Sequence, residues 1–439
     1  MQEQLLHFIW HRGLFSHEAL KTTHDDEVEI LKPGIPNHDQ GPDFLQGRIR
    51  IGEQVWAGHI EIHVRSSEWF LHMHEQDTHY NNVILHVVWT EDKPATNTTG
   101  IRIPCLELSE RVDRMLLERY AHLMRNEEWV PCASSLSSVP GLIRTSWLER
   151  LMSERLEGKT DYILKILEQC DQDWEQAFFV IMARQLGAPA NSDSMENLAL
   201  KTPLKLLRKH SDRTDQIEAL LFGIAGMLTK EINAGYPMLL KREFDFLKIK
   251  YGLQTMPSLH WKFMRMRPVH FPTIRLAQLA GIISDNTHFI TLLSEIKSPV
   301  EWINKFMVTP DHEYWNEHYH FKSGSATVVK RLGKDTASAL VINLVAPFMF
   351  VYGKMHGLQN LKERAVQMLS ELPPEKNAII KGWNETGWVA EDAGQSQALL
   401  HLKKKYCDAK RCLHCAVGMR VMASTVGRPE ADGDMLSHH

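Results

Sequence analysis

The sequence lacks the features that mark an exported or membrane protein. The first residues, MQEQLLHFIWHRGLF, show no basic stretch ahead of an apolar run and no small-residue cleavage site, so we expect no signal peptide. The longest apolar stretch, ALVINLVAPFMFVYG from Ala339, contains Asn343 and Pro347 and is too short to span a bilayer. We therefore expect a buried segment there, no membrane association, and a cytoplasmic protein.

The sequence also has few cysteines and a small net charge. Only six cysteines occur in 439 residues, and without an export signal we expect reduced thiols or metal ligands rather than disulfides. The formal net charge of -4 gives no overall basic field, so contact with nucleic acid would need a local basic patch. The length predicts two or three domains, and the sequence leaves the oligomeric state open.

The N-terminal part, residues 1–130, is predicted to be a small α/β domain. Apolar residues at helical spacing give way to period-two alternation from about Gly47, and β-branched residues follow. The expected elements, in order, are an amphipathic helix within 2–20, a hairpin of 47–51 and 54–64 that turns at Gly52–Glu53, a short helix, and strands at 82–89 and 101–108.

The remainder, residues 142–425, is predicted to be mainly α-helical. Ser-rich residues 134–141 are expected to be a linker, and residues 426–439 a flexible tail. Helical patterns are strongest at 147–167, 174–186, 214–232 and 274–298, and 219–228 (ALLFGIAGML) is expected to lie in the core. The overall fold class is therefore α+β.

Two carboxylates flank the predicted hairpin. Gly41–Pro42–Asp43–Phe44 precedes its first strand, and Glu61 and His63 lie two residues apart on its second strand, so they share one face. If the strand that opens near Asp43 pairs with the second strand, Asp43 lies beside Glu61. Two carboxylates there can hold a hard divalent cation and activate a water for attack on a phosphodiester. The alternative is a turn-forming Asp43 and a solvated Glu61.

Residues 1–110 resemble a PD-(D/E)XK nuclease-like (restriction-endonuclease-like) core. The resemblance rests on Pro42–Asp43 at one strand and Glu61-x-His63 on the next, with the order helix, three-stranded meander, helix, strand. It implies that Asp43 and Glu61 bind Mg²⁺ or Mn²⁺, and that Asp43, Glu61 and His63 are catalytic. His63 stands where that family usually has lysine. Histidine is mostly neutral near pH 7, so its role as base, ligand or hydrogen-bond donor stays open.

Most of the chain also resembles an uncharacterised bacterial family known only as a domain of unknown function. The segments that carry this resemblance are GPDF, GHIEIHVRSSEW, the H-x-H-x-x-D-x-x-Y block, YNNVILHVVW, RPVHFPTIRLAQLAG and the C-terminal cysteines. The resemblance implies no activity.

Histidine is concentrated between Trp56 and Val87. Six of the 24 histidines fall in these 32 residues, where an even distribution would place roughly two. The six are His59, His63, His72, His74, His79 and His86. The H-x-H-x-D-H zinc loop of metallo-β-lactamases does not fit, because Asp77 comes one residue late and Thr78 separates it from His79.

A second interpretation places the segment after the Glu61–His63 strand over the same face. Its side chains would then orient a metal ligand or contact the phosphates of a nucleic acid. The residues expected to bind nucleic acid are Arg65, Ser66, Ser67, His72, His74 and Asp77. His86, inside an apolar strand, is expected to be a hydrogen-bonded core residue rather than a ligand.

Three of the six cysteines, Cys407, Cys412 and Cys415, form the pattern C-x4-C-x2-C. Thiolates at this spacing can share Zn²⁺ or an iron–sulfur cluster, with His414, His401 or a distant cysteine (Cys105, Cys132 or Cys170) as the fourth ligand. The alternative is a set of reduced, helix-packed thiols.

The sequence thus supports three hypotheses. The first is a divalent-metal-dependent nuclease-like enzyme that acts on DNA or RNA. The second is a catalytically inactive module that binds nucleic acid or protein, and the third is a structural or interaction protein stapled by metal at its C-terminal cysteines.

Overall fold

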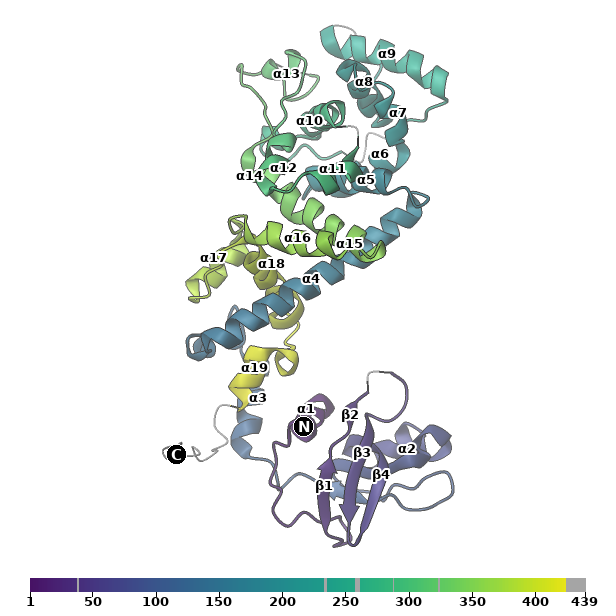
Figure 1. Cartoon of the computed structure of the whole chain (residues 1–439), viewed down its shortest axis with the longest axis vertical. Coiled ribbons are helices and arrows are strands. Elements are labelled where there is room, and N and C mark those ends of the chain that lie inside the picture. Colours follow the sequence, from purple (N-terminus) through teal and green to yellow (C-terminus); the bar gives the residue numbers. More distant parts are fainter. Residues whose placement is uncertain (38, 233–234, 257–260, 287, 323, 424–439) are drawn as a thin grey trace, which may run out of the picture. The chain divides into compact units, whose positions relative to one another are not determined.

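The computed structural model describes residues 1–423 apart from 38, 233–234, 257–260, 287 and 323. The expected tail at 426–439 lies outside the described residues. The chain divides into two compact units (Figure 1). Unit 1 combines Met1–Ile143 with Lys404–His439, and unit 2 is Arg144–Lys403. The segment that carries the three C-terminal cysteines therefore belongs to the same unit as the N-terminal sheet.

Unit 1 contains a mixed six-stranded sheet, so the predicted α+β class is confirmed. The strand order is β1-β3-β4-β5-β6, and β2 pairs with the other end of β3. Strands β1, β3 and β4 are antiparallel, whereas β4, β5 and β6 run parallel (Figure 1). The elements are α1 (Glu3–Arg12), β1 (Val28–Lys32), β2 (Ile35–Pro36), β3 (Phe44–Ile51), β4 (Gln54–Arg65), α2 (Glu68–Leu71), η1 (His74–Gln76), η2 (Thr78–Asn82), β5 (Val83–Thr90), β6 (Cys105–Glu107), α3 (Arg114–Arg125), η3 (Ala133–Ser138), η8 (Cys412–His414) and α19 (Ala416–Ala423).

The predicted hairpin is confirmed as β3 and β4. Ile51 pairs with Gln54 across a two-residue turn, and Gly52 adopts the left-handed φ of 57° that such turns require. Strands β1 and β2 were not expected from the sequence. The predicted strand at 101–108 is reduced to β6, because only its last half pairs with β5.

The register of the sheet places the polar residues of β4 and β5 together. Glu61 lies directly opposite His86 in the parallel pair, so both side chains emerge on the same face of the sheet. The alternate residues Ile60 and Ile62 are fully buried on the other face, and this burial holds the register.

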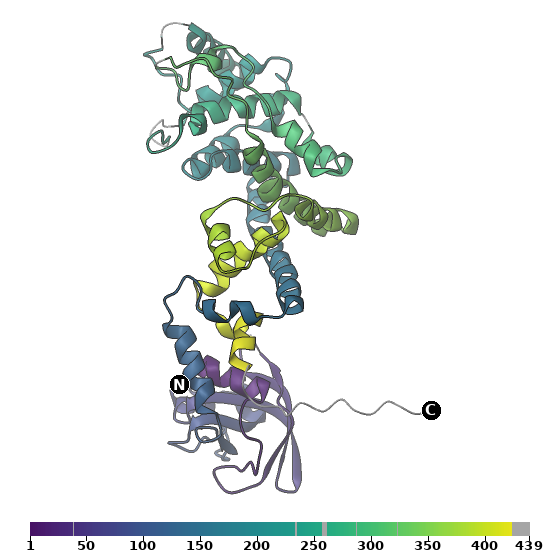
Figure 2. The same cartoon turned by 90° about the vertical axis from the view of Figure 1, so that its left-hand side faces the viewer.

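The C-terminal segment of unit 1 is bonded to its N-terminal helices. Arg119 on α3 donates to the carbonyl oxygen of Met422 at 3.0 Å, and Arg12 at the end of α1 lies 3.2 Å from the sulfur of Met419. Figure 2 shows α19, in yellow, next to α1 and α3. Two parts of the chain 303 residues apart at this hydrogen bond thus form one unit.

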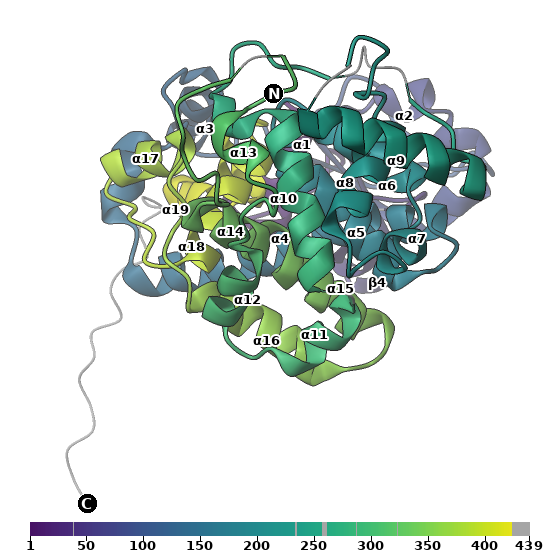
Figure 3. The same ribbon diagram turned by 90° about the horizontal axis from the view of Figure 1, so that it is seen from above.

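The regular elements of unit 2, among its described residues, are helices joined by loops (Figure 3). Its helices are α4 (Gly141–Gln169, which begins just inside unit 1), α5 (Trp174–Leu186), α6 (Ser192–Lys201), α7 (Leu204–Arg208), α8 (Thr214–Ile224), α9 (Gly235–Tyr251), η5 (Pro268–His270), α10 (Pro272–Asp285), α11 (Phe289–Glu295), α12 (Pro299–Phe306), α13 (Tyr314–Glu317), α14 (Lys334–Leu340), η6 (Val341–Val345), α15 (Ala346–Met355), α16 (Gln359–Ser370), α17 (Ala378–Glu385) and α18 (Ala393–His401). The π-helical turn η7 (Leu402–Cys407) leads from α18 back into unit 1.

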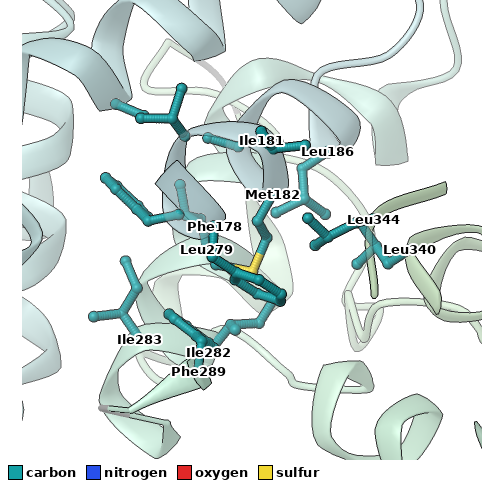
Figure 4. Close-up of a cluster of buried hydrophobic side chains, with 14 of the residues drawn as sticks. Phe178, Ile181, Met182, Leu186, Leu279, Ile282, Ile283, Phe289, Leu340 and Leu344 are labelled. Carbon is teal, nitrogen blue, oxygen red and sulfur yellow. The ribbon is translucent and has the colours of Figure 1, made fainter. Parts of the chain in front are cut away.

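The core of unit 2 is built around α5 and α10. Residues 272–283 of α10 are buried on every side, which is the pattern of a central helix rather than an amphipathic surface helix. Its apolar residues meet those of α5 and of the segment from Leu340 to Leu344 (Figure 4). Arg275 is accommodated there because its guanidinium donates to Gln278 at 2.9 Å and lies 2.6 Å from His270 Nδ1.

The apolar segment from Ala339 is buried, as expected. It belongs to a continuous helical stretch, Lys334–Met355, that is long and apolar enough to cross a bilayer by length and composition alone, yet 72% of its most apolar window is buried within the protein. Its π-helical turn, Val341–Val345, precedes Pro347, whose ring has no N–H to donate to the carbonyl of Asn343.

Two expected helices are shorter in the structure. The pattern at 214–232 yields α8, which ends at Ile224 ahead of Gly226 with φ 71°. The pattern at 274–298 is divided into α10 and α11. The predicted helix at 174–186 matches α5 at both ends. Asp173 caps its first turn by accepting hydrogen bonds from the amides of Glu175 and Gln176.

Two glycines in unit 2 should respond oppositely to alanine. A Cβ at Gly223 on α8 would overlap the buried ring of Phe244 on α9, so we expect G223A to lower the free energy of unfolding by about 1–3 kcal/mol. Gly158 on α4 has nothing within 4 Å of its Cβ position, so G158A should raise it by about 0.5–1 kcal/mol. Urea unfolding followed by circular dichroism measures both, and equal stability of the two variants would contradict the packing of α8 against α9.

Candidate metal centre

The histidine-rich stretch folds into one cluster on the face of β4. The imidazole rings of His63, His72 and His74 form a near-equilateral triangle, with centroid separations of 5.1, 5.4 and 5.4 Å. Within the part of the chain that the structure describes, they form a group of three whose ligand atoms all lie within 4.8 Å of one another. This arrangement could hold a metal ion.

Local backbone geometry brings the three rings together. His63 is fixed by β4, whereas His72 and His74 flank Met73, which adopts the left-handed conformation with φ 59° between α2 and η1. His74 stacks on Tyr80 with a centroid separation of 3.8 Å, and this contact holds its ring over the sheet.

Glu61 and His63 are buried, at 4% and 1% exposure, so the alternative of a solvated Glu61 was wrong. The segment after β4 folds back over this face, as the second interpretation of the sequence placed it. His72 is exposed, and Asp43 retains a side-chain exposure of 25%. The cluster therefore opens to solvent on the side of these two residues.

Glu61 lies beside two of the three histidines. His63 Nε2 lies 3.1 Å from His72 Nδ1 and 3.7 Å from Glu61 Oε1. Glu61 Oε1 in turn lies 3.3 Å from His74 Nε2. Metal–ligand bonds of about 2.0–2.1 Å in a tetrahedron place neighbouring ligand atoms about 3.3–3.4 Å apart. The contacts of Glu61 with His63 and His74 are close to this spacing, so its carboxylate lies next to the group of three imidazoles that could hold an ion.

His86 orients His63 from the sheet side. Its Nε2 lies 2.9 Å from His63 Nδ1, and it is fully buried, as expected of a core histidine. A proton on His63 Nδ1 donated to His86 leaves the lone pair of His63 Nε2 directed at the cluster. Histidines that bind metals are commonly fixed in this way by the hydrogen bond of the other ring nitrogen.

Asp43 and Glu61 meet, as the sequence predicted. The backbone N–H of Asp43 donates to Glu61 Oε2 at 3.1 Å, and the carboxylate of Asp43 accepts from the backbone N–H of Ile62 at 3.0 Å. Asp43 Oδ2 also lies 3.3 Å from His7 Nε2 on α1. Asp43 is therefore held at the rim of the cluster by both β4 and α1.

The electrostatics of the cluster favour a cation. Burial, reinforced by the charge of Asp43, raises the pKa of Glu61 to about 9. Burial and the neighbouring histidines lower the pKa of His63 to about 2, and burial lowers the pKa of His86 to about 3. His63 is thus a neutral imidazole with a lone pair to share. A divalent cation bound here would supply a positive charge next to the carboxylate of Glu61.

Ser66 and Ser67 were expected to contact nucleic acid, and both form hydrogen bonds within the protein. The hydroxyls of Ser66 and Ser67 donate to the carboxylate of Asp92 at 3.1 and 2.8 Å, and Ser66 is fully buried. Arg65 is exposed at the end of β4. Contact of these three residues with nucleic acid stays a prediction, and the geometry leaves Arg65 as the one whose side chain is open to solvent.

Asp77 does not join the cluster. Its carboxylate accepts from the backbone N–H of His79 at 2.9 Å and lies 2.7 Å from His79 Nδ1, so it caps η2. The other two expected members of this segment, His72 and His74, are part of the triangle. Contact of His72, His74 and Asp77 with nucleic acid stays a prediction, and the sequence did not predict that His72 and His74 would form a possible metal site with His63.

None of the six cysteines forms a disulfide. Among the described residues, the group with ligand atoms within 4.8 Å of one another consists of histidines, and Cys407, Cys412 and Cys415 do not form such a group. Metal binding by these cysteines stays a prediction.

Sequence reasoning missed His7. It lies on the polar side of α1, 36 residues from Asp43, and no local pattern connects the two. Although burial opposes protonation, the hydrogen bond and charge of Asp43 raise the pKa of His7. The one available signal was the amphipathic character of residues 2–20, which places His7 opposite the buried Leu5, Leu6 and Ile9.

Metal binding should depend on His72 and not on His79. We expect Zn²⁺ or Mn²⁺ to bind and, at a free concentration of about 100 times Kd, to stabilise the protein by about 2.7 kcal/mol. H72A should weaken affinity by more than about 100-fold, beyond the loss expected for an orienting partner. Calorimetric titration measures both. H79A is the matched control, because His79 is exposed in the same segment but lies outside the triangle. Equal affinity of the two variants would exclude this site.

Comparisons with known proteins identify a family whose description gives no function. A family model described as "Protein of unknown function (DUF2851)" matches residues 3–378, a range that includes the whole histidine cluster. No curated protein and no solved structure matches the chain. The resemblance of residues 1–110 to a nuclease core therefore gains no support from these comparisons, whereas the resemblance to a domain of unknown function is confirmed. The chain belongs to the DUF2851 family.

Proposed function

We propose that unit 1 is a transition-metal-dependent phosphodiesterase that acts on nucleic acid. The observation that carries the proposal is the convergence of His63, His72 and His74 at a spacing that could hold a metal ion, with the carboxylate of Glu61 and then Asp43 beside them. Imidazole ligands favour Mn²⁺, Fe²⁺ or Zn²⁺ over Mg²⁺. This refines the sequence-based expectation of Mg²⁺ or Mn²⁺ held by Asp43 and Glu61 alone.

The element order of unit 1 supports the substrate class. Helix α1, the antiparallel strands β1, β3 and β4, the short helix α2 and the parallel strand β5 follow one another as in the nuclease-like core that Pro42–Asp43 and Glu61-x-His63 resemble. Asp43 immediately precedes β3, and Glu61 lies on the neighbouring strand. Phosphodiester hydrolysis is the reaction that such a pair of carboxylates performs in that fold.

Each residue would have a distinct task. A divalent cation bound here would supply Lewis acidity for a phosphoryl oxygen and for the attacking water. Glu61, His63 and His74 are buried and set the position of the ion, while His72 lies at the open side. His63 remains neutral, so it acts as a ligand and does not supply the positive charge of the lysine in the related motif.

The pair of His7 and Asp43 is placed to accept the proton that the attacking water would release. Their side chains are 29% and 25% exposed at the rim, with His7 Nε2 and Asp43 Oδ2 3.3 Å apart. The carboxylate fixes the ring and stabilises its protonated form, as in other acid–base pairs of histidine with aspartate. His7 is therefore placed to accept a proton from a water at the open side of the cluster.

The proposal predicts metal-dependent cleavage that requires Glu61. Metal-stripped full-length protein supplied with Mn²⁺ should cleave labelled single-stranded DNA, duplex DNA or RNA. E61Q keeps the volume of the side chain but removes its charge, so we expect the rate to fall by at least about 100-fold. Gel analysis of the labelled strands measures the rate.

H79A serves as the active control, and circular dichroism checks that E61Q is folded. Metal-stimulated cleavage that E61Q leaves unchanged would show that the activity comes from another site or from a contaminant, and would overturn the proposal. Absence of cleavage of all three substrates by metal-loaded protein would overturn it as well.

A catalytically inactive module is the second candidate. It is favoured by the burial of Glu61 and His63, which narrows access to the ion. In that case metal binding would stabilise unit 1 without turnover, and a nucleic acid or protein would bind near the exposed His72 and Arg65. The third hypothesis, a structural protein stapled by C-terminal metal, concerns residues outside this cluster.

A further inference from the structure

The C-terminal cysteines lie on a short, tightly closed loop. The amide of Cys415 donates to the carbonyl of Cys412 at 3.2 Å across η8, and the amide of Lys410 donates to the carbonyl of Cys407 at 3.1 Å. Two successive turns thus separate the three cysteines, and Cys415 directly precedes α19.

A glycine allows this loop to pack closely against the helix that follows. A Cβ at Gly418 would overlap the backbone of Cys412, so α19 and the turn at Cys412 can approach this closely only because residue 418 has no side chain. The position of Cys412 relative to Cys415 is therefore fixed by backbone packing rather than by side-chain choice.

Hydrogen bonds then attach the loop to a distant part of unit 1. The ammonium group of Lys410 donates to the carbonyl of Met124 on α3, and Arg119 donates to the carbonyl of Met422. Just beyond α3, Asn126 donates to the carbonyl of Pro131 at 3.0 Å and so positions the next residue, Cys132.

Cys132 lies beside α19, the helix that Cys415 directly precedes. A cavity of about 270 Å³ is lined by Cys132 together with Arg420 of α19 and Leu123 of α3. Cys132, Cys412 and Cys415 are all buried, with exposures of 9%, 6% and 6%. Burial, followed by the neighbouring Cys415 and Cys412, raises the pKa of Cys132 to about 12. The thiols would become thiolates if a metal bound them.

We propose that Cys132, Cys407, Cys412 and Cys415 form a second metal centre, of the thiolate class that takes Zn²⁺ or an iron–sulfur cluster. Cys132 is the distant fourth ligand that the C-x4-C-x2-C pattern lacks. The four sulfurs do not form the tight group seen for the histidines, so they must close around a single ion or span a larger cluster. Lys404, Lys405, Lys410 and Arg411 are next to these cysteines in sequence and would offset the thiolate charge.

The centre is independent of the proposed hydrolytic site. It would join residue 132 to residues 407–415 and so fasten the C-terminal segment to the rest of unit 1. Removal of the histidine ligands should leave it intact, so the two proposals can fail separately.

Metal analysis of full-length protein tests the proposal. Protein purified without oxygen, or reconstituted either with Zn²⁺ or with Fe²⁺ and sulfide, should contain zinc, or iron with acid-labile sulfide, that H63A/H74A retains. C132S and C412S should each lose that metal, and for iron also the visible absorption of its thiolate complex.

C170S and C105S are the matched controls, because both residues are buried cysteines that lie outside the proposed set, and both variants should keep the metal. Retention of metal by a folded C132S protein would overturn the fourth ligand. If C132S does not fold, the wild-type protein decides: binding of neither zinc nor iron–sulfur under these conditions would overturn the centre itself.

Discussion

The cluster in unit 1 depends on one constraint, the burial of the Glu61 carboxylate among imidazoles. An ionised carboxylate is costly to bury unless positive charge or hydrogen bonds compensate it. Two groups approach it within hydrogen-bonding range, the backbone N–H of Asp43 and the ring of His74. The turn at Met73, the stacking of His74 on Tyr80 and the bond between His63 and His86 all place nitrogen atoms around this carboxylate.

Much of the sheet could be predicted because the relevant signals are local. Alternation in residues 47–64 and the turn at Gly52 fix the hairpin, and its register brings Asp43 to Glu61. Strands β1 and β2 were not predicted because they are short edge segments. Their mostly exposed side chains leave no alternating apolar pattern in the sequence.

The site was only partly predictable, for a different physical reason. The spacing of His72 and His74 showed that the segment was unusual, but their meeting with His63 depends on a left-handed residue, Met73, that no composition rule would select. His7 is brought in by the packing of α1. Such contacts between distant segments are set by tertiary structure, so a sequence motif can name candidates but cannot decide which of them converge.

The discontinuity of unit 1 has a consequence for how the protein is made. A ribosome completes residues 1–143 first, then all of unit 2, and only afterwards the segment from Lys404 that α3 and α1 bind. Unit 2 is continuous and can finish folding while unit 1 still lacks its last helix. The β-sheet of unit 1 is therefore synthesised well before the segment that covers α3, and that segment can complete the domain only after unit 2 has been made.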